Sequence, residues 1–192
     1  GNQYFIDRLS AEGLPVPEFL KTVGDRPLYK EEGTDAFYMT VKGDYAVVPV
    51  ADDAWMLADI KRGREPVMSN KGASIWDLGD GVACLEIHTK MNSIDQDVVA
   101  MLQEAGKIDK KGFKALVIGN DADNFSVGAN VGLALFAANA AMWPVIENSM
   151  SEGQNALMKL KYAPFPVVAA PAGMALGGGC EIVLSAAAVQ AH

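Results

Sequence analysis

The sequence predicts an α/β fold, because short apolar runs typical of strands alternate with apolar residues at helical spacing from residue 73 onward. With 192 residues and 50% hydrophobic side chains, the chain can form one well-packed core with a smaller appended segment. The pattern changes near residue 70. We therefore expect residues 1–70 to be the appended segment and residues 71–192 to contain the core.

The appended segment shows only short elements separated by glycine and proline. Helices are expected at Tyr4–Leu9 and Glu18–Val23. Polar and aromatic residues then alternate with turn residues. A further helix is expected at Asp53–Arg62, just before the break at Gly63-Arg64-Glu65-Pro66. No large core is predicted for this part of the chain.

Three segments of the second part have the pattern of β-strands or hairpins. Ile75–Ile87 is typical of a hairpin around the turn Gly79-Asp80-Gly81. Ala115–Ile118 is a short apolar run bounded by polar residues, which is the form of a strand buried on both faces. Val167–Ala170 is expected to form a further strand, after Pro164 and Pro166 have stopped the preceding helix.

Helices are expected between these strands. Ser93 and Gln96 have the spacing of a capping box, so one helix should start at Ser93 or Ile94. Asn130–Lys161 is predicted to be helical, and Pro144 should kink it or divide it in two. The apolar stripe along its second half fits either the core or a subunit interface.

Composition and charge argue against several partners. The net charge of −8 comes with no basic run longer than Lys110-Lys111, which disfavours nucleic acid. No apolar run is long enough for a membrane span, and no signal-peptide pattern occurs. The two cysteines, Cys84 and Cys180, lie far apart in apolar contexts. We expect a soluble, cytoplasmic protein.

The segment most informative about chemistry joins the last strand to a final helix, expected at about Gly178–Ala188. Gly177–Gly179 permit close backbone approach, and the helix start presents unpaired N–H groups that favour negative charge. Neither glycine pattern of a nucleotide-binding loop occurs, which leaves an oxyanion as the ligand. Glu181 lies in the first turn, where it could act as a general base. Tight packing by the glycines and simple dipole compensation by Glu181 explain the segment equally well.

A second loop, Asn124–Asn130, also opens a helix and offers further N–H groups, so donors from two loops could converge on one oxygen. An ordinary glycine-containing helix start is the alternative. Ser126 does not fit a nucleophile elbow, because Asn124 stands where glycine is needed. With only His88 and His192 available, neither a serine hydrolase triad nor a metal-ligand cluster is indicated.

These two loops resemble the oxyanion motifs of the crotonase (enoyl-CoA hydratase/isomerase) superfamily, over roughly residues 73–192. Phe125–Asn130 is similar to the family's F-S-A-G-A-D motif, and Gly173–Glu181 matches its second motif. The resemblance implies a crotonase-like domain, a ββα spiral, present in part and preceded by the appended segment.

The resemblance also implies site residues. Backbone N–H groups of Ala129 and Gly178 would bind the thioester oxygen, and Glu181 would be the first catalytic glutamate. The ligand would be an acyl-CoA thioester as substrate, with no metal and no cofactor in this chain. The residues implied to contact the substrate or its CoA part are Lys90, Met91, Asn92, Ser93, Ile94, Asn130 and Gly177.

A more detailed resemblance links the chain to fused bacterial 3-hydroxyacyl-CoA dehydrogenase/enoyl-CoA hydratase proteins of fatty-acid β-oxidation. Gly79–Asp95 carries it, and Ala11–Pro17 resembles the tail of the dehydrogenase. Residues 1–70 would then be that tail and a linker, and NAD would serve only the missing dehydrogenase part. The implied reaction is hydration of 2-enoyl-CoA. Isomerisation, thioester hydrolysis, or acyl-CoA binding or assembly without chemistry are the alternatives.

The chain also departs from the family pattern. It stops at His192, before the region of the second glutamate and before the helices through which the family usually trimerises. Asn130 replaces the common Asp, and Ala187 stands where Asp is frequent. The resemblance implies a homo-oligomer for the full-length protein.

Overall fold

The computed structural model describes residues 1–50 and 56–191, which form two compact units, 1–64 and the remainder from Glu65. The sequence predicted the change near residue 70. The second unit begins earlier because β4 (Met68–Ser69) pairs with the hairpin that follows.

The first unit combines two helices with a small antiparallel sheet. The helices are α1 (Asn2–Ala11) and α2 (Glu18–Val23), at the places expected from the sequence. The sheet was not predicted and has the strand order β1-β2-β3. Its strands are β1 (Tyr29–Glu32), β2 (Asp35–Met39) and β3 (Tyr45–Val47).

Few side chains of the first unit are buried, Val23 and Met39 among them. The helix predicted at Asp53–Arg62 is seen as α3 (Leu57–Lys61). The predicted positions 53–55 lie outside the described residues. The small core agrees with the prediction of an appended segment without a large apolar interior.

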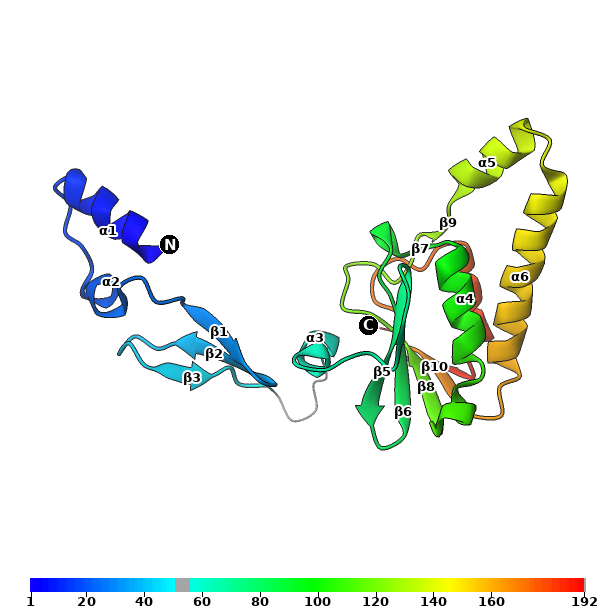
Figure 1. Cartoon of the computed structure of the whole chain (residues 1–192), viewed down its shortest axis with the longest axis horizontal. Helices are drawn as coiled ribbons and strands as arrows, with labels where there is room; N and C mark the ends of the chain where they lie inside the picture. Colours follow the sequence, from blue (N-terminus) through cyan, green and yellow to red (C-terminus); the bar gives the residue numbers. More distant parts are fainter. Residues whose placement is uncertain (51–55, 192) are drawn as a thin grey trace. The chain divides into compact units, whose positions relative to one another are not determined.

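The second unit is built on a six-stranded mixed sheet with the order β11-β10-β8-β6-β5-β4 (Figure 1). The hairpin predicted from the sequence is confirmed, since β5 and β6 pair antiparallel. From β6 onward the neighbouring strands are parallel, which confirms the α/β prediction. The bounds are β5 (Ala73–Gly79), β6 (Val82–Ile87), β8 (Ala115–Ile118), β10 (Val167–Ala169) and β11 (Ala188–Val189).

Four α-helices accompany this sheet. The predicted division of the long helical segment is confirmed, and Pro144 lies in the first turn of its second helix. The final helix ends at Ser185, earlier than predicted, because the next residues enter β11. The bounds are α4 (Gln96–Ala105), α5 (Val131–Asn139), α6 (Trp143–Lys161) and α7 (Gly178–Ser185), with short 3-10 turns at Lys90–Asn92 and Ile108–Lys111.

The predicted start of α4 at Ser93 or Ile94 was wrong. Both residues form strand β7, which pairs in parallel with β9 (Gly128–Ala129). The helix is capped instead by Asp95, whose Oδ1 accepts a hydrogen bond of 2.9 Å from Val98 N. A long-range strand pairing therefore overrides the local capping signal.

The core of the second unit lies between one face of the sheet and the helices α4 and α6. It consists of apolar side chains with almost no exposed surface, contributed by the strands, the helices and the loop at Phe125. The largest fully buried ones are Phe125, Ile75, Leu85, Ile108, Leu116, Ile118, Leu160, Ile182, Val98 and Val167.

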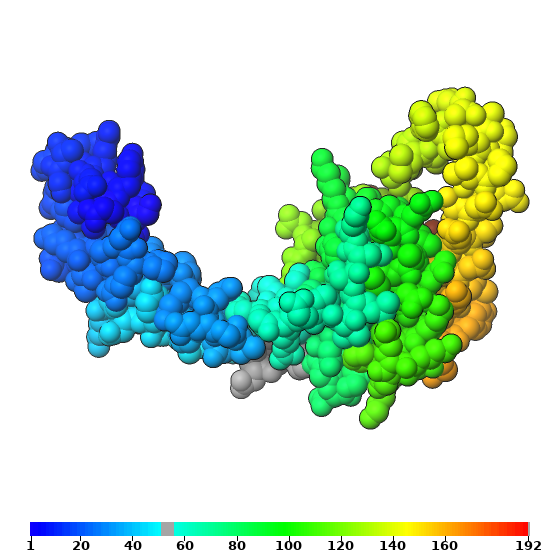
Figure 2. Space-filling model, viewed as in Figure 1, coloured from blue at the N-terminus to red at the C-terminus, as the bar shows by residue number. Residues whose placement is uncertain are grey.

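Helix α5 and the start of α6 remain exposed despite their apolar sequence. Val131 and Phe136 of α5 are 76% and 69% exposed. Figure 2 shows their yellow-green to yellow atoms standing clear of the body of the same unit. The apolar stripe of α6 is buried at Leu160 but exposed at Met150, so only its C-terminal part is core. Within the described residues, no helix combines the length and apolar character that a membrane crossing requires.

Replacement of Leu85 by alanine should lower the stability of the second unit by about 2–5 kcal/mol, because Leu85 is fully buried in the central hairpin strand. Leu184→Ala is the matched control, since Leu184 is 72% exposed. Its effect should stay within about 0.5 kcal/mol. Urea unfolding of both variants tests this, and equal losses would contradict the assigned core.

Candidate functional site

Three loops that are distant in sequence meet at one end of the second unit. The pairing of β7 with β9 joins the loop 90–94 to the loop 124–130. A parallel bridge between Ser126 and Ala175 joins the latter to the loop 173–179. These loops contain every site residue predicted from the sequence except Glu181, which lies two residues further on.

Ser126 is fully buried and bonds to both neighbouring loops. Its backbone N–H donates to Met174 O at 3.0 Å, and its carbonyl accepts from Leu176 N at 2.9 Å. Its hydroxyl donates to Asn92 O at 2.6 Å and accepts from Gly128 N at 3.1 Å. One residue therefore holds all three loops.

Two asparagines add further cross-links. Asn92 is buried, and its Nδ2 donates to Asn124 O at 2.9 Å. Asn124 Oδ1 in turn accepts from Met174 N at 3.1 Å. Asn92 and Met91 both have positive φ angles, 51° and 57°, and asparagine is among the residues that tolerate this conformation best.

The backbone nitrogens of Ala129 and Gly178 lie close together. A methyl group placed on Gly178 would be 3.8 Å from Ala129 N and 3.7 Å from Glu181 Oε2. Because a Cβ lies about 2.5 Å from its own nitrogen, the two nitrogens are within about 6 Å of each other. A separation of this size allows both N–H groups to reach one oxygen atom.

Gly178 is the first residue of α7, where a backbone N–H has no acceptor within the helix. No described residue accepts a hydrogen bond from this N–H. Glu181 is exposed and lies in the first turn, where the positive end of the helix dipole stabilises a carboxylate. The arrangement can therefore present a donor and a carboxylate to one small acyl group.

The other predicted residues occupy different positions around this point. Gly177 is the residue preceding α7, and Lys90 and Met91 are exposed in the adjoining loop. Asn130 is exposed and caps α5, since its Oδ1 accepts from Gly132 N at 3.1 Å. Its side chain therefore already has a structural partner.

No structural role of Asn124 or Ser126 was predicted from the sequence. Ser126 entered only as a rejected nucleophile, although a serine hydroxyl that accepts from the backbone N–H two residues further on, as from Gly128 here, is a known local hydrogen bond. Its bond to Asn92 spans 34 residues, and the bond from Asn92 to Asn124 spans 32. Such partners have no signal in a local pattern.

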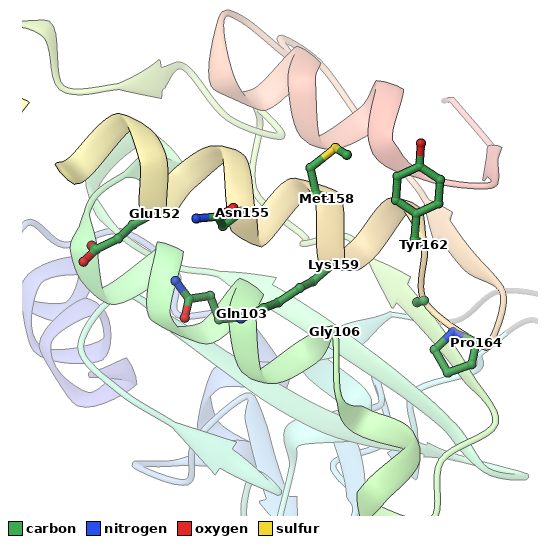
Figure 3. Close-up of a pocket in the computed structure, with 9 residues that line it drawn as sticks. Gln103, Gly106, Glu152, Asn155, Met158, Lys159, Tyr162 and Pro164 are labelled. Carbon is green, nitrogen blue, oxygen red and sulfur yellow. The ribbon is translucent and has the colours of Figure 1, made fainter. Parts of the chain in front are cut away.

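A groove of about 650 Å³ lies between α4 and α6, away from these loops (Figure 3). None of the predicted site residues lines it. Among the described residues, no group of three or more His, Cys, Asp or Glu side chains could hold a metal ion. The lining residues are Gln103, Gly106, Glu152, Asn155, Met158, Lys159, Tyr162, Ala163 and Pro164.

Gly173→Ala should destabilise the chain by at least about 3 kcal/mol, because Gly173 has a φ of 65° and an added methyl group would collide with the carbonyl oxygen of Asp123. Gly177→Ala is the control. Its φ is 49°, but nothing lies within 4 Å of an added methyl group, so about 1–2 kcal/mol of backbone strain is expected. Chemical denaturation measures both; similar losses would refute the tight contact at Gly173.

Solved structures share the fold of the second unit. One of them is a Streptomyces coelicolor protein whose name, enoyl-CoA hydratase, is provisional. It superposes on this chain with a TM-score of 0.58 at 22% identity. The match covers 67% of this chain and 48% of that one. The second unit is therefore a partial crotonase-like domain, and the crotonase resemblance predicted from the two loops is confirmed.

Sequence comparison extends the similarity to the whole chain, although no family model matches it. The chain is 36% identical over 194 residues to a probable 3-hydroxyacyl-CoA dehydrogenase of Bacillus subtilis. A provisionally named fatty acid oxidation complex trifunctional enzyme of Rickettsia felis is 32% identical over 70% of the chain. The chain spans only 24% and 18% of these relatives, so it corresponds to a part of each.

Proposed function

We propose that the second unit binds an acyl-CoA thioester and supplies the oxyanion-binding amides and one carboxylate of an enoyl-CoA hydratase of fatty-acid β-oxidation. The observation that supports this most is the convergence of Ala129 N, Gly178 and Glu181 Oε2 around one point. The crotonase-like fold and the names of the relatives point in the same direction.

In this proposal the N–H groups of Ala129 and Gly178 donate to the thioester oxygen. Hydration adds the hydroxyl of water to C3 of a 2-enoyl-CoA and a proton to C2, and negative charge develops on that oxygen between the two additions. Fixed amide donors stabilise this charge, and each is worth about 10²–10³ in rate.

Glu181 would assist the transfer of protons between water and the substrate. Glu181 lies in the first turn of α7, and a carboxylate is a group that can accept a proton from water. The second carboxylate of the reaction would come from outside this chain. The reaction itself needs no redox cofactor, and NAD would serve only a dehydrogenase part such as the relatives' names indicate.

The loop Lys90–Ile94 would contact the CoA part of the substrate through its backbone. The β7–β9 pairing supports this, because it places Ser93 and Ile94 next to Gly128 and Ala129. The loop and the amides could then hold two portions of one ligand. Asn130 and Gly177, which lie next to Ala129 and Gly178 in sequence, would complete the contact with the substrate.

The first unit would be the tail of a dehydrogenase followed by a linker. The full-length similarity to the Bacillus subtilis protein supports this assignment. For a longer protein that contains both units, we further propose a homo-oligomer that works in the cytoplasm.

A second candidate is acyl-CoA binding without turnover. It is favoured by the exposed position of Glu181, since a carboxylate open to water lacks the water-excluded surroundings that strengthen catalysis. Isomerases and thioester hydrolases could use the same two amides, because each reaction also passes through an intermediate with negative charge on the acyl oxygen.

Calorimetry should detect binding of crotonyl-CoA to the 192-residue chain.

In a protein that continues the chain through the rest of a crotonase domain, Glu181→Gln should lower the rate of crotonyl-CoA hydration by at least about 100-fold, with affinity changed only a few-fold. Undiminished turnover would exclude Glu181 as acid or base. Binding without any hydration by the longer protein would favour the second candidate, and product analysis with several acyl-CoAs would separate the related reactions.

Gly178→Ala should weaken crotonyl-CoA binding by at least about tenfold, because the added methyl group would lie 3.8 Å from Ala129 N, where the thioester oxygen is expected, and would displace Ile94, whose Cδ1 would be only 2.9 Å from it. Gly153→Ala in α6 is the matched control, since nothing lies within 4 Å of its added methyl group. It should stabilise the chain by about 0.5–1 kcal/mol and leave binding unchanged. Equal affinities of the two variants would disprove the location of the acyl group.

A further inference from the structure

We propose that Ser126 is a positioning residue, whose buried hydroxyl fixes the orientation of the Ala129 amide and couples it to the loop Lys90–Ile94. This inference deepens the proposed function and rests on it. The hydroxyl donates to Asn92 O at 2.6 Å and accepts from Gly128 N at 3.1 Å. It therefore connects the proposed CoA-binding loop to the residue that immediately precedes Ala129.

The backbone of Ser126 extends the same connection to the third loop. Its N–H and C=O bond to Met174 and Leu176 at 3.0 and 2.9 Å. Side chain and backbone thus point to different loops, and all four hydrogen bonds converge on a residue with no exposed surface. A shift of Ser126 would displace the Ala129 and Gly178 amides relative to each other.

Contact with the start of α7 tightens this arrangement. A methyl group placed on Gly179 would lie 2.8 Å from Ser126 Cβ and 2.9 Å from Ser126 O. Only glycine permits α7 to approach Ser126 so closely. The helix that presents the Gly178 N–H therefore rests directly on the residue that orients the opposite amide.

The hydroxyl is committed to these structural bonds, which excludes a nucleophilic role in the observed geometry. Its proton points to the Asn92 carbonyl. His88 is not a partner, because its Nε2 lies 2.9 Å from the hydroxyl of Ser74. Removal of the Ser126 hydroxyl would leave the Asn92 carbonyl and the Gly128 N–H without this partner in a buried site, which is unfavourable.

The first test needs no ligand and uses the 192-residue chain. Ser126→Ala should accelerate hydrogen exchange of the Gly128 amide and of amides in the loop 90–94 by about tenfold or more, measured by NMR. Exchange in the β5–β6 hairpin should stay unchanged. Ser74→Ala is the matched control, because it removes another buried hydroxyl, outside the three loops. Unchanged exchange of the loop amides in Ser126→Ala would overturn the proposal.

The second test separates positioning from a general loss of stability. The carbonyl stretch of [1-¹³C]crotonyl-CoA is recorded by difference infrared spectroscopy with the chain saturated by ligand, so that reduced affinity does not alter the result. Wild-type chain should lower the frequency relative to free ligand, and Ser126→Ala should reduce this shift by about half or more. Ser126→Cys, whose thiol is slightly larger and a weaker hydrogen-bonding group, should be intermediate.

The outcomes distinguish the two levels of the hypothesis. A full shift in Ser126→Ala would overturn the positioning role, even if the loops exchange faster. Absence of any shift in the wild-type chain would overturn the proposed function, and the exchange measurement would still decide whether Ser126 holds the loops. If Ser126→Ala does not fold, the same two measurements on Ser126→Cys decide the question.

Discussion

The parallel pairing of Ser93–Ile94 with Gly128–Ala129 is the constraint on which the candidate site depends. It brings a loop that precedes α4 next to the loop that precedes α5. Two residues on each side form only a short ladder, which contributes little on its own. The buried hydrogen bonds of Ser126 and Asn92 make this short contact specific, since a slip in register would leave their partners unsatisfied.

Elements with a strong local pattern could be predicted from the sequence. The hairpin β5–β6 has mostly apolar strands on either side of a glycine-containing turn, the strand β8 is a continuous apolar run, and α2 is bounded by proline and glycine. The start of α4 could not be predicted from the sequence. Its apparent capping residue, Ser93, belongs to a strand whose partner lies 35 residues away. The first unit's sheet was missed for another reason: its strands bury few side chains, so the alternation that marks a strand is weak.

The candidate site shows the same division between local and distant information. Glycines at a strand-to-helix junction and a glutamate in the next turn are visible in the sequence, because the backbone requirement and the helix dipole act locally. The contacts that hold the loops together involve Asn92, Asn124 and Ser126 across 32 to 50 residues. Only the fold shows that these side chains meet.

Geometry and exclusion of water are distinct requirements for an oxyanion site, and the described residues provide mainly the first. Fixed amides stabilise charge most strongly where water is absent. Yet Glu181 is exposed, and the apolar side chains of α5 next to Asn130 and of α7 at Leu184 have no cover in the second unit. The chain spans about half of the solved hydratase structure it resembles. If the second unit holds an acyl group as proposed, exclusion of water would need the exposed apolar side chains of α5 and α7 to be covered.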